Sequence, residues 1–137
     1  MVKFLNHINK QEEKWLRKQA TQESYGPGDV IFSECEERHA LFLIRSGVVR
    51  VEPAHSEFNI EIARLNVGKI FGEMNFLQGF NVTASVVAND KVELDVVNAD
   101  VIDELIAKDE GIFGRFYQSL AYIFCTRLRD ITLRGFS

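Results

Sequence analysis

The sequence contains few of the residues that most often carry out catalysis or bind metal ions. It has two cysteines, two prolines and three histidines among 137 residues. Cys35 and Cys125 belong to no C-x-x-C pair, and the histidines lie far apart, outside any metal-ligand spacing. The G-x-S-x-G, H-E-x-x-H, P-loop and G-x-G-x-x-G patterns are absent. We therefore expect two reduced thiols, no metal centre and no enzymatic activity.

Long hydrophobic runs are also missing. No apolar run approaches the length of about 20 residues that a membrane-spanning helix needs. The first residues, MVKFLNHINKQEEKWLRK, carry too many charges for a signal peptide. These two absences predict a soluble, cytoplasmic protein that does not contact a membrane.

An excess of positive charge is absent as well. The net charge is −4, which does not favour binding to a nucleic-acid backbone. Arg127, Arg129 and Arg134 lie near the C-terminus, where cations interact favourably with the dipole of a helix. We therefore expect no DNA-binding element.

The composition predicts one domain that covers residues 1–137. Hydrophobic residues make up 46% of the chain and charged residues 26%, which is ordinary for a globular protein. Good helix formers from Asn9 to Gln19 predict a short amphipathic helix within an N-terminal helical segment, residues 1–20. A β-rich segment follows over residues 21–98, and residues 99–137 are predicted to be helical.

The β-rich segment consists of short apolar runs separated by turn signals. Gly26-Pro27-Gly28-Asp29, Gly47 and Gly68 interrupt the chain at turns. Strands that recur at a spacing of about 8–12 residues indicate a compact β sandwich or barrel. The predicted strands are 30–32, 40–44, 48–51, 58–63, 69–71, 82–88 and 92–97, with one helical turn at 74–77.

The C-terminal segment predicts two helices. Asn98 or Asp100 is a candidate cap for a helix that ends at Ala107, and a longer helix begins near Asp109 or Gly111. This longer helix has two apolar stripes at helical spacing. Either both stripes form one broad surface towards the core, or one of them is shared between the subunits of a homodimer. The first stripe contains Phe113, Tyr117, Leu120, Phe124, Leu128 and Ile131, and the second contains Ile112, Phe116 and Ile123.

The segment from Phe71 to Ser85, FGEMNFLQGFNVTAS, has the features of a turn that holds a phosphate group. A glycine and a carboxylate precede a short hydrophobic turn, and small polar residues follow it. Backbone N–H groups at the start of a short helix bind anions, and glycine allows a close approach. Val82 lies where such a site would need a cation.

These residues together resemble the cyclic nucleotide-binding domain, as found in bacterial catabolite activators and kinase regulatory subunits. The resemblance covers roughly Phe4 to Thr132 and rests on three segments in order: GDVIFSECEERHALFLIRSG from Gly28, the stretch from Leu65-x-x-Gly68 to Phe71-Gly72-Glu73, and RFYQSLAYIFCTRLRDIT from Arg115. It implies a mostly β fold: an eight-stranded jelly-roll β roll with an N-terminal helix and two C-terminal helices.

The resemblance also implies a ligand site. In the family, a glutamate matched by Glu73 accepts a hydrogen bond from the ribose 2′-hydroxyl, and a Pro-Arg pair meets the cyclic phosphate. That pair is replaced by Asn81 and Val82 here, so the charge-assisted contact to the phosphate is lost. The candidate ligand-binding residues are Gly72, Glu73, Asn75, Thr83 and Thr132. Lys69 and Arg64 are candidates for a substitute cation, and Glu73 is equally well explained as a plain helix-capping residue.

Two hypotheses follow for the function. In the first, the chain is a non-catalytic sensor that binds cAMP or cGMP weakly, or binds another phosphate-bearing ligand, and needs no other cofactor. In the second, it is a ligand-free interaction or dimerisation domain that acts through the C-terminal helix on an unknown effector protein. A metal enzyme of the cupin type is kept only as a control, since it would need two histidines one residue apart.

Overall fold

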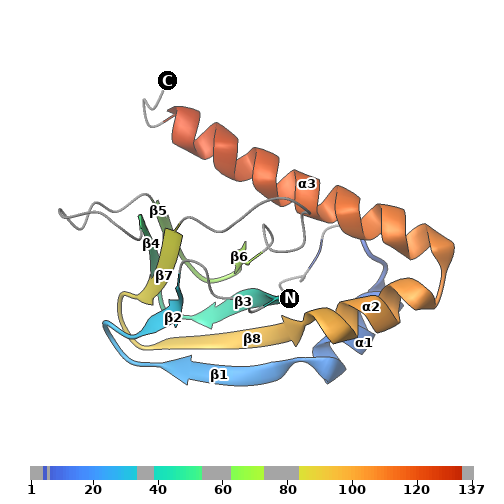
Figure 1. Ribbon diagram of the computed structural model, residues 1–137, viewed down its shortest axis with the longest axis horizontal. Helices are drawn as coiled ribbons and strands as arrows, with labels where there is room; N and C mark the ends of the chain where they lie inside the picture. Colours follow the sequence, from blue (N-terminus) through green and yellow to red (C-terminus); the bar gives the residue numbers. More distant parts are fainter. Residues whose placement is uncertain (1–4, 6, 34–38, 54–62, 73–83, 134–137) are drawn as a thin grey trace. The chain divides into compact units, whose positions relative to one another are not determined.

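The computed structural model in Figure 1 describes residues 5, 7–33, 39–53, 63–72 and 84–133. The chain divides into two compact units. One unit contains Met1–Gln19 and Asp100–Ser137, and the other contains Ala20–Ala99. The predicted segment boundaries lie one residue away from these divisions, while the prediction of a single domain over residues 1–137 stays a prediction. The two units are described separately below.

Two antiparallel four-stranded sheets form the β unit in the described part of the chain. Sheet A has the order β1 (Thr21–Tyr25), β8 (Val92–Asn98), β3 (Ala40–Ser46), β6 (Ile70–Phe71). Sheet B has the order β2 (Val30–Phe32), β7 (Ala84–Ala88), β4 (Val49–Pro53), β5 (Ala63–Leu65). The predicted fold class, a mostly β structure with flanking helices, is confirmed.

The core of the β unit is built from alternate residues of its strands. Phe42 and Ile44 of β3 belong to the core, together with Leu94 and Val96 of β8. Because neighbouring residues of a strand point to opposite faces, Leu41 lies on the other face of sheet A, and it is buried as well. Burial on both faces explains why β3 reads as a continuous apolar run in the sequence.

Two strands of the β unit were largely missed by the prediction from sequence: β1 in full, and β5 apart from Ala63, the last residue of the strand predicted for 58–63. Both are edge strands. The sequence of β1, TQESY, has no apolar alternation, yet its backbone pairs with β8 from Thr21↔Val96 to Tyr25↔Val92. In β5 only Leu65 is buried. An edge strand with little buried surface leaves no hydrophobic signal, so its pairing is visible only in the structure. Residues 58–62 of the predicted strand and the predicted helical turn at 74–77 lie outside the described residues.

Three helices are present in the described part of the helical unit, each close to its predicted position. They are α1 (Lys10–Gln19), α2 (Ala99–Ala107), whose first residue belongs to the β unit, and α3 (Glu110–Leu133). A capping box starts α1: the Asn9 N–H donates to Glu12 Oε1 at 2.8 Å, and the Glu12 N–H donates to Asn9 Oδ1 at 2.9 Å. Asp109 caps α3 by accepting a hydrogen bond from the Gly111 N–H at 2.8 Å.

The N-terminal part of the helical unit is attached to the other two helices by polar contacts. The His7 N–H donates to Ser119 Oγ of α3 at 3.0 Å, and Glu12 pairs with Arg115 of α3. At the turn between α2 and α3, the Lys108 Nζ lies 4.4 Å from the centre of the Trp15 ring, a cation–π contact.

The two apolar stripes of α3 differ in burial. Ile112 and Phe116 of the second stripe are buried, and Leu120 of the first stripe is buried beside them. Phe113 and Phe124 of the first stripe are 53% and 39% exposed. The second stripe therefore supplies most of the buried face of α3, and part of the first stripe is left exposed.

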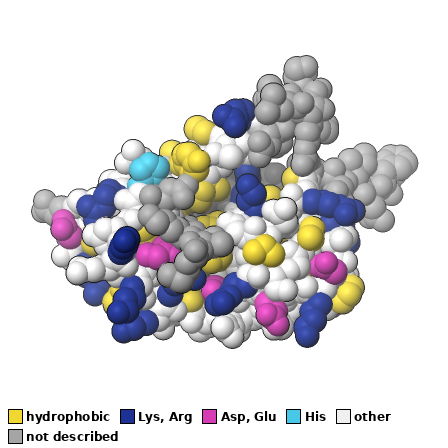
Figure 2. Space-filling model, turned by 180° about the vertical axis from the view of Figure 1, so that it is seen from behind, with side chains coloured by type: hydrophobic (Ala, Val, Ile, Leu, Met, Phe, Trp, Pro, Cys, Tyr) yellow, Lys and Arg dark blue, Asp and Glu magenta, His cyan; other side chains and the backbone are white. Residues whose placement is uncertain are grey.

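The molecular surface has mixed charge on the face drawn in Figure 2. Lys and Arg side chains there are interspersed with Asp and Glu side chains, and hydrophobic side chains form small groups. Within the described part of the chain, no helix combines the length and the apolar character needed to cross a membrane. Cys125 is an exposed free thiol, and Cys35 lies outside the described residues.

The core assignment makes a prediction about stability. Val49 is fully buried on β4, whereas Val30 on β2 is 54% exposed. We expect Val49→Ala to lower the free energy of unfolding by about 1.5–3 kcal/mol, because it removes buried methyl groups and leaves a cavity. The matched change Val30→Ala should cost less than about 1 kcal/mol. Urea denaturation of both variants measures the difference, and equal losses would contradict the core assignment.

Candidate functional site

The candidate site begins at Gly72, directly after β6. Its backbone has a φ of +92°, in the left-handed region that favours glycine. A Cβ atom at this position would lie 2.5 Å from the carbonyl oxygen of Ala40 and 3.0 Å from the ring of Phe42. Any other residue would therefore be disfavoured twice, by the backbone conformation and by a clash with β3.

β6 is held against β3 by both backbone and side chains. The register pairs Phe42 with Phe71, and the two rings are stacked at 4.7 Å with an interplanar angle of 3°. The turn before β6 is joined to β3 by two hydrogen bonds: Gly68 N–H donates to the Ile44 carbonyl at 2.9 Å, and Ile44 N–H donates to the Lys69 carbonyl at 3.0 Å. The start of the candidate ligand segment, which runs from Gly72 to Ala84, is thus fixed by the core.

The end of the same segment is fixed in the other sheet. β7 begins at Ala84 in sheet B, where it pairs with β4 through Pro53↔Ala84 and Glu52↔Ser85. Residues 73–83 therefore connect β6 of sheet A to β7 of sheet B. Both ends of this segment are therefore fixed by strand pairing, one against β3 and the other against β4.

Of the candidate ligand-binding residues, the structure describes Gly72 in full. Thr132 lies in the last turn of α3, and its side chain lies outside the described part. Glu73, Asn75 and Thr83 lie outside the described residues, as does Val82. The roles of all five candidates in ligand binding stay predictions.

The two candidates for a substitute cation occupy different places. Arg64 lies opposite Arg50 in the register of β4 with β5, while the neighbouring pair Val49↔Leu65 belongs to the core. Arg64 is therefore on the face of sheet B that points away from the core. Lys69 is exposed in the turn before β6, three residues ahead of Gly72.

On that outer face of sheet B, the positive charge of Arg50 is balanced by the carboxylate of Glu52. Its Nε lies 2.9 Å from Glu52 Oε1, and its Nη1 donates to Asn89 Oδ1 at 2.9 Å. This arrangement lets two arginines occupy opposite positions on neighbouring strands. Among the described residues, no group of His, Cys, Asp or Glu side chains is arranged to hold a metal ion.

Four glycines with a positive φ lie in the segments on which the resemblance rests: Gly28, Gly47, Gly68 and Gly72. The family model of the cyclic nucleotide-binding domain matches residues 22–109, which include all four. The chain belongs to the cyclic nucleotide-binding domain family. Apart from the first strand position, Thr21, the match covers every strand of sheets A and B.

Curated relatives and solved structures agree with this assignment. The chain is 29% identical over 123 residues to cyclic GMP-binding protein C of Dictyostelium discoideum, covering 88% of this chain and 5% of the relative. It is 25% identical over 114 residues to the cAMP-dependent protein kinase regulatory subunit of Hypocrea atroviridis, covering 83% and 24%. The chain thus spans a small part of these relatives.

The fold of a solved cyclic nucleotide-binding domain from Methylobacillus flagellatus matches that of this chain. The TM-score is 0.82 at 22% sequence identity, and the match covers 98% of this chain and 76% of the other. At this identity the match concerns the fold.

The site geometry predicts the effect of replacing Gly72. Gly72 and Gly28 share a left-handed backbone, with φ values of +92° and +86°, but a Cβ at Gly28 would meet nothing within 4 Å. Gly28→Ala should cost about 1–2 kcal/mol from backbone strain alone. Gly72→Ala should cost at least about 1 kcal/mol more, because it adds the clash with Ala40. Thermal unfolding of the two variants tests this, and an equal loss would show that the approach to β3 imposes no constraint.

Proposed function

We propose that the chain is a non-catalytic sensor module that binds a cyclic nucleotide, with an affinity weakened by Val82. The family assignment supports the ligand class, and two relatives carry the words cyclic GMP-binding and cAMP-dependent in their names. The single observation that carries the proposal is the anchored segment between Gly72 and Ala84. Gly72 fixes the start of this segment against β3, and the backbone N–H groups that follow it are the proposed contacts to the phosphate.

The substitution at Val82 sets the expected affinity. An arginine at this position would form a charge-assisted hydrogen bond to the cyclic phosphate, a contact that contributes about 1.5–3 kcal/mol. Its absence weakens the complex by about 10- to 150-fold relative to an arginine-containing site. The remaining contacts to the phosphate are assigned to backbone N–H groups after Gly72 and to Thr83, and the contact to the ribose is assigned to Glu73.

Calorimetric titration with cAMP and with cGMP tests the sensor proposal. We expect weak binding by the natural chain, and binding about 10- to 150-fold tighter by Val82→Arg. Inorganic phosphate serves as the probe for the alternative that the segment binds a simpler anion. Thr83→Ala in the Val82→Arg background is the control, and it should lose part of the gain. No heat from either variant at millimolar nucleotide would refute the proposal.

The second candidate function is homodimerisation through α3, and the exposed part of its first stripe supports it. Phe113 is 53% exposed and lies against Tyr117, with ring centroids 4.7 Å apart. Phe124 follows Phe113 about three turns later on the same side of the helix. Large aromatic side chains in a row gain free energy when a partner covers them. A second copy of the chain presents the same stripe, as a symmetric interface requires.

Light scattering at micromolar protein tests this second function. We expect the natural chain to show twice its mass of 15.7 kDa. The double change Phe113→Glu and Phe124→Glu should return the mass to that of one chain, because it places charges in the contact. Gln118→Glu, at an exposed position on another side of α3, is the matched control and should leave the dimer intact. A mass near 15.7 kDa for the natural chain would contradict dimerisation.

A further inference from the structure

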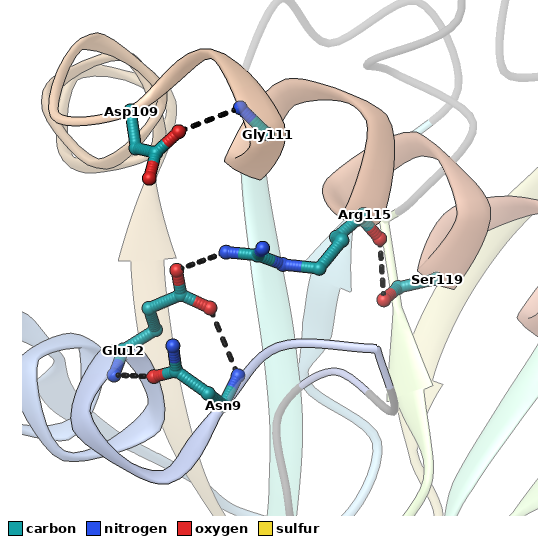
Figure 3. Close-up of polar contacts among 6 residues, drawn as sticks. All are labelled: Asn9, Glu12, Asp109, Gly111, Arg115 and Ser119. Atoms are coloured by element: carbon teal, nitrogen blue, oxygen red, sulfur yellow. Dashed lines mark hydrogen bonds and ion pairs between the residues drawn. The ribbon is translucent and has the colours of Figure 1, made fainter.

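Glu12 has two roles in the helical unit. Its Oε1 accepts a hydrogen bond from the Asn9 N–H at 2.8 Å and so completes the capping box of α1. Its Oε2 pairs with Nη2 of Arg115 on α3. Figure 3 shows the carboxylate between these two partners. The Glu12 side chain is only 10% exposed, so it is largely removed from competing water. The cap of one helix is therefore also a contact to another.

A second contact lies one turn further along α3. The His7 N–H donates to Ser119 Oγ at 3.0 Å, and the Ser119 hydroxyl donates to the Arg115 carbonyl at 2.9 Å. Ser119 is fully buried, so the His7 N–H would have no water to replace this acceptor. Arg115 and Ser119 are four residues apart and thus lie on the same side of α3. The segment before α1 and the first turn of α1 are tied to α3 at two adjacent points.

The beginning of α3 needs such external support. Gly111 and Gly114 both lie within its first two turns, and glycine is the weakest helix former apart from proline. A Cβ at Gly114 would meet nothing within 4 Å, so close packing does not require glycine there. The local sequence therefore makes the start of α3 easy to open, and the cap at Asp109 together with the contacts to Glu12 and His7 hold it closed.

We infer that these contacts form a latch, defined as the Glu12–Arg115 ion pair and the His7–Ser119 hydrogen bond. The latch makes the start of α1 and the start of α3 open together. A displacement of α3 must either take the N-terminal segment with it or break both contacts. The inference concerns the helical unit alone and goes beyond ligand binding, so it does not depend on the proposed function.

Hydrogen–deuterium exchange of the backbone amides tests the latch without nucleotide. Glu12→Gln keeps the capping box, because glutamine also accepts the Asn9 N–H, but it removes the ion pair. We expect amides at residues 112–118 of α3 to exchange about tenfold faster in this variant. Arg115→Gln should reciprocally speed exchange at the start of α1, although Arg115 lies in another helix.

Two further variants separate the latch from simpler explanations. Asp109→Asn removes a carboxylate beside α3 but keeps its cap, so exchange in α3 should change less than about twofold. Gly114→Ala should slow exchange in α3 by about fivefold, and combined with Glu12→Gln it should restore protection. If Glu12→Gln alters exchange in α1 alone, or in α3 no more than Asp109→Asn does, the latch is wrong. Neither result bears on whether nucleotide binds, so the two proposals fail independently.

Discussion

The pairing of β6 with β3 is the contact on which the candidate site depends. The Phe71 ring stacks on Phe42 inside the core, and Gly72 follows at once with its backbone against the Ala40 carbonyl. The segment after Gly72 therefore starts from β6, an edge strand of sheet A that is packed against β3, and ends at Ala84 in sheet B. Apolar packing and backbone sterics fix Gly72, and the pairing of β7 with β4 fixes Ala84, so folding sets the positions of both ends of the segment.

The sequence predicted the fold where burial leaves a periodic or continuous apolar pattern. β3 and β8 are buried on both faces, so the apolar residues of these strands can be recognised in the sequence. β1 and β5 are edge strands whose pairing depends on the backbone of a neighbour, and this leaves no trace in side-chain hydrophobicity. On α3, both apolar stripes have helical spacing, and periodicity alone could not tell that Phe116 is buried while Phe113 is exposed.

Among the candidate site residues, Gly72 is the one described in full, and the physical reason for its glycine lies outside the local sequence. Gly72 belonged to the motif that resembles the family, yet its need for glycine comes from Ala40 and Phe42, on another strand. The Asn9-x-x-Glu12 pattern is a helix-start signature that the sequence displays. The partner of Glu12 is Arg115, 103 residues away, and no local sequence pattern predicts such a pair. Contacts of this range require the folded chain.

Gly72 and position 82, at the two ends of the candidate ligand segment, are under different constraints. Gly72 is required by the approach of β6 to β3 whether or not a ligand binds, so its presence says that the fold is intact and says nothing about affinity. An arginine at position 82 would contact the phosphate and not the core, so a chain can lose it without losing stability of the fold. The family fold and a weakened phosphate contact are therefore compatible in one molecule. On the proposal above, residues 81–83 set the affinity for nucleotide, and the glycines that define the fold do not.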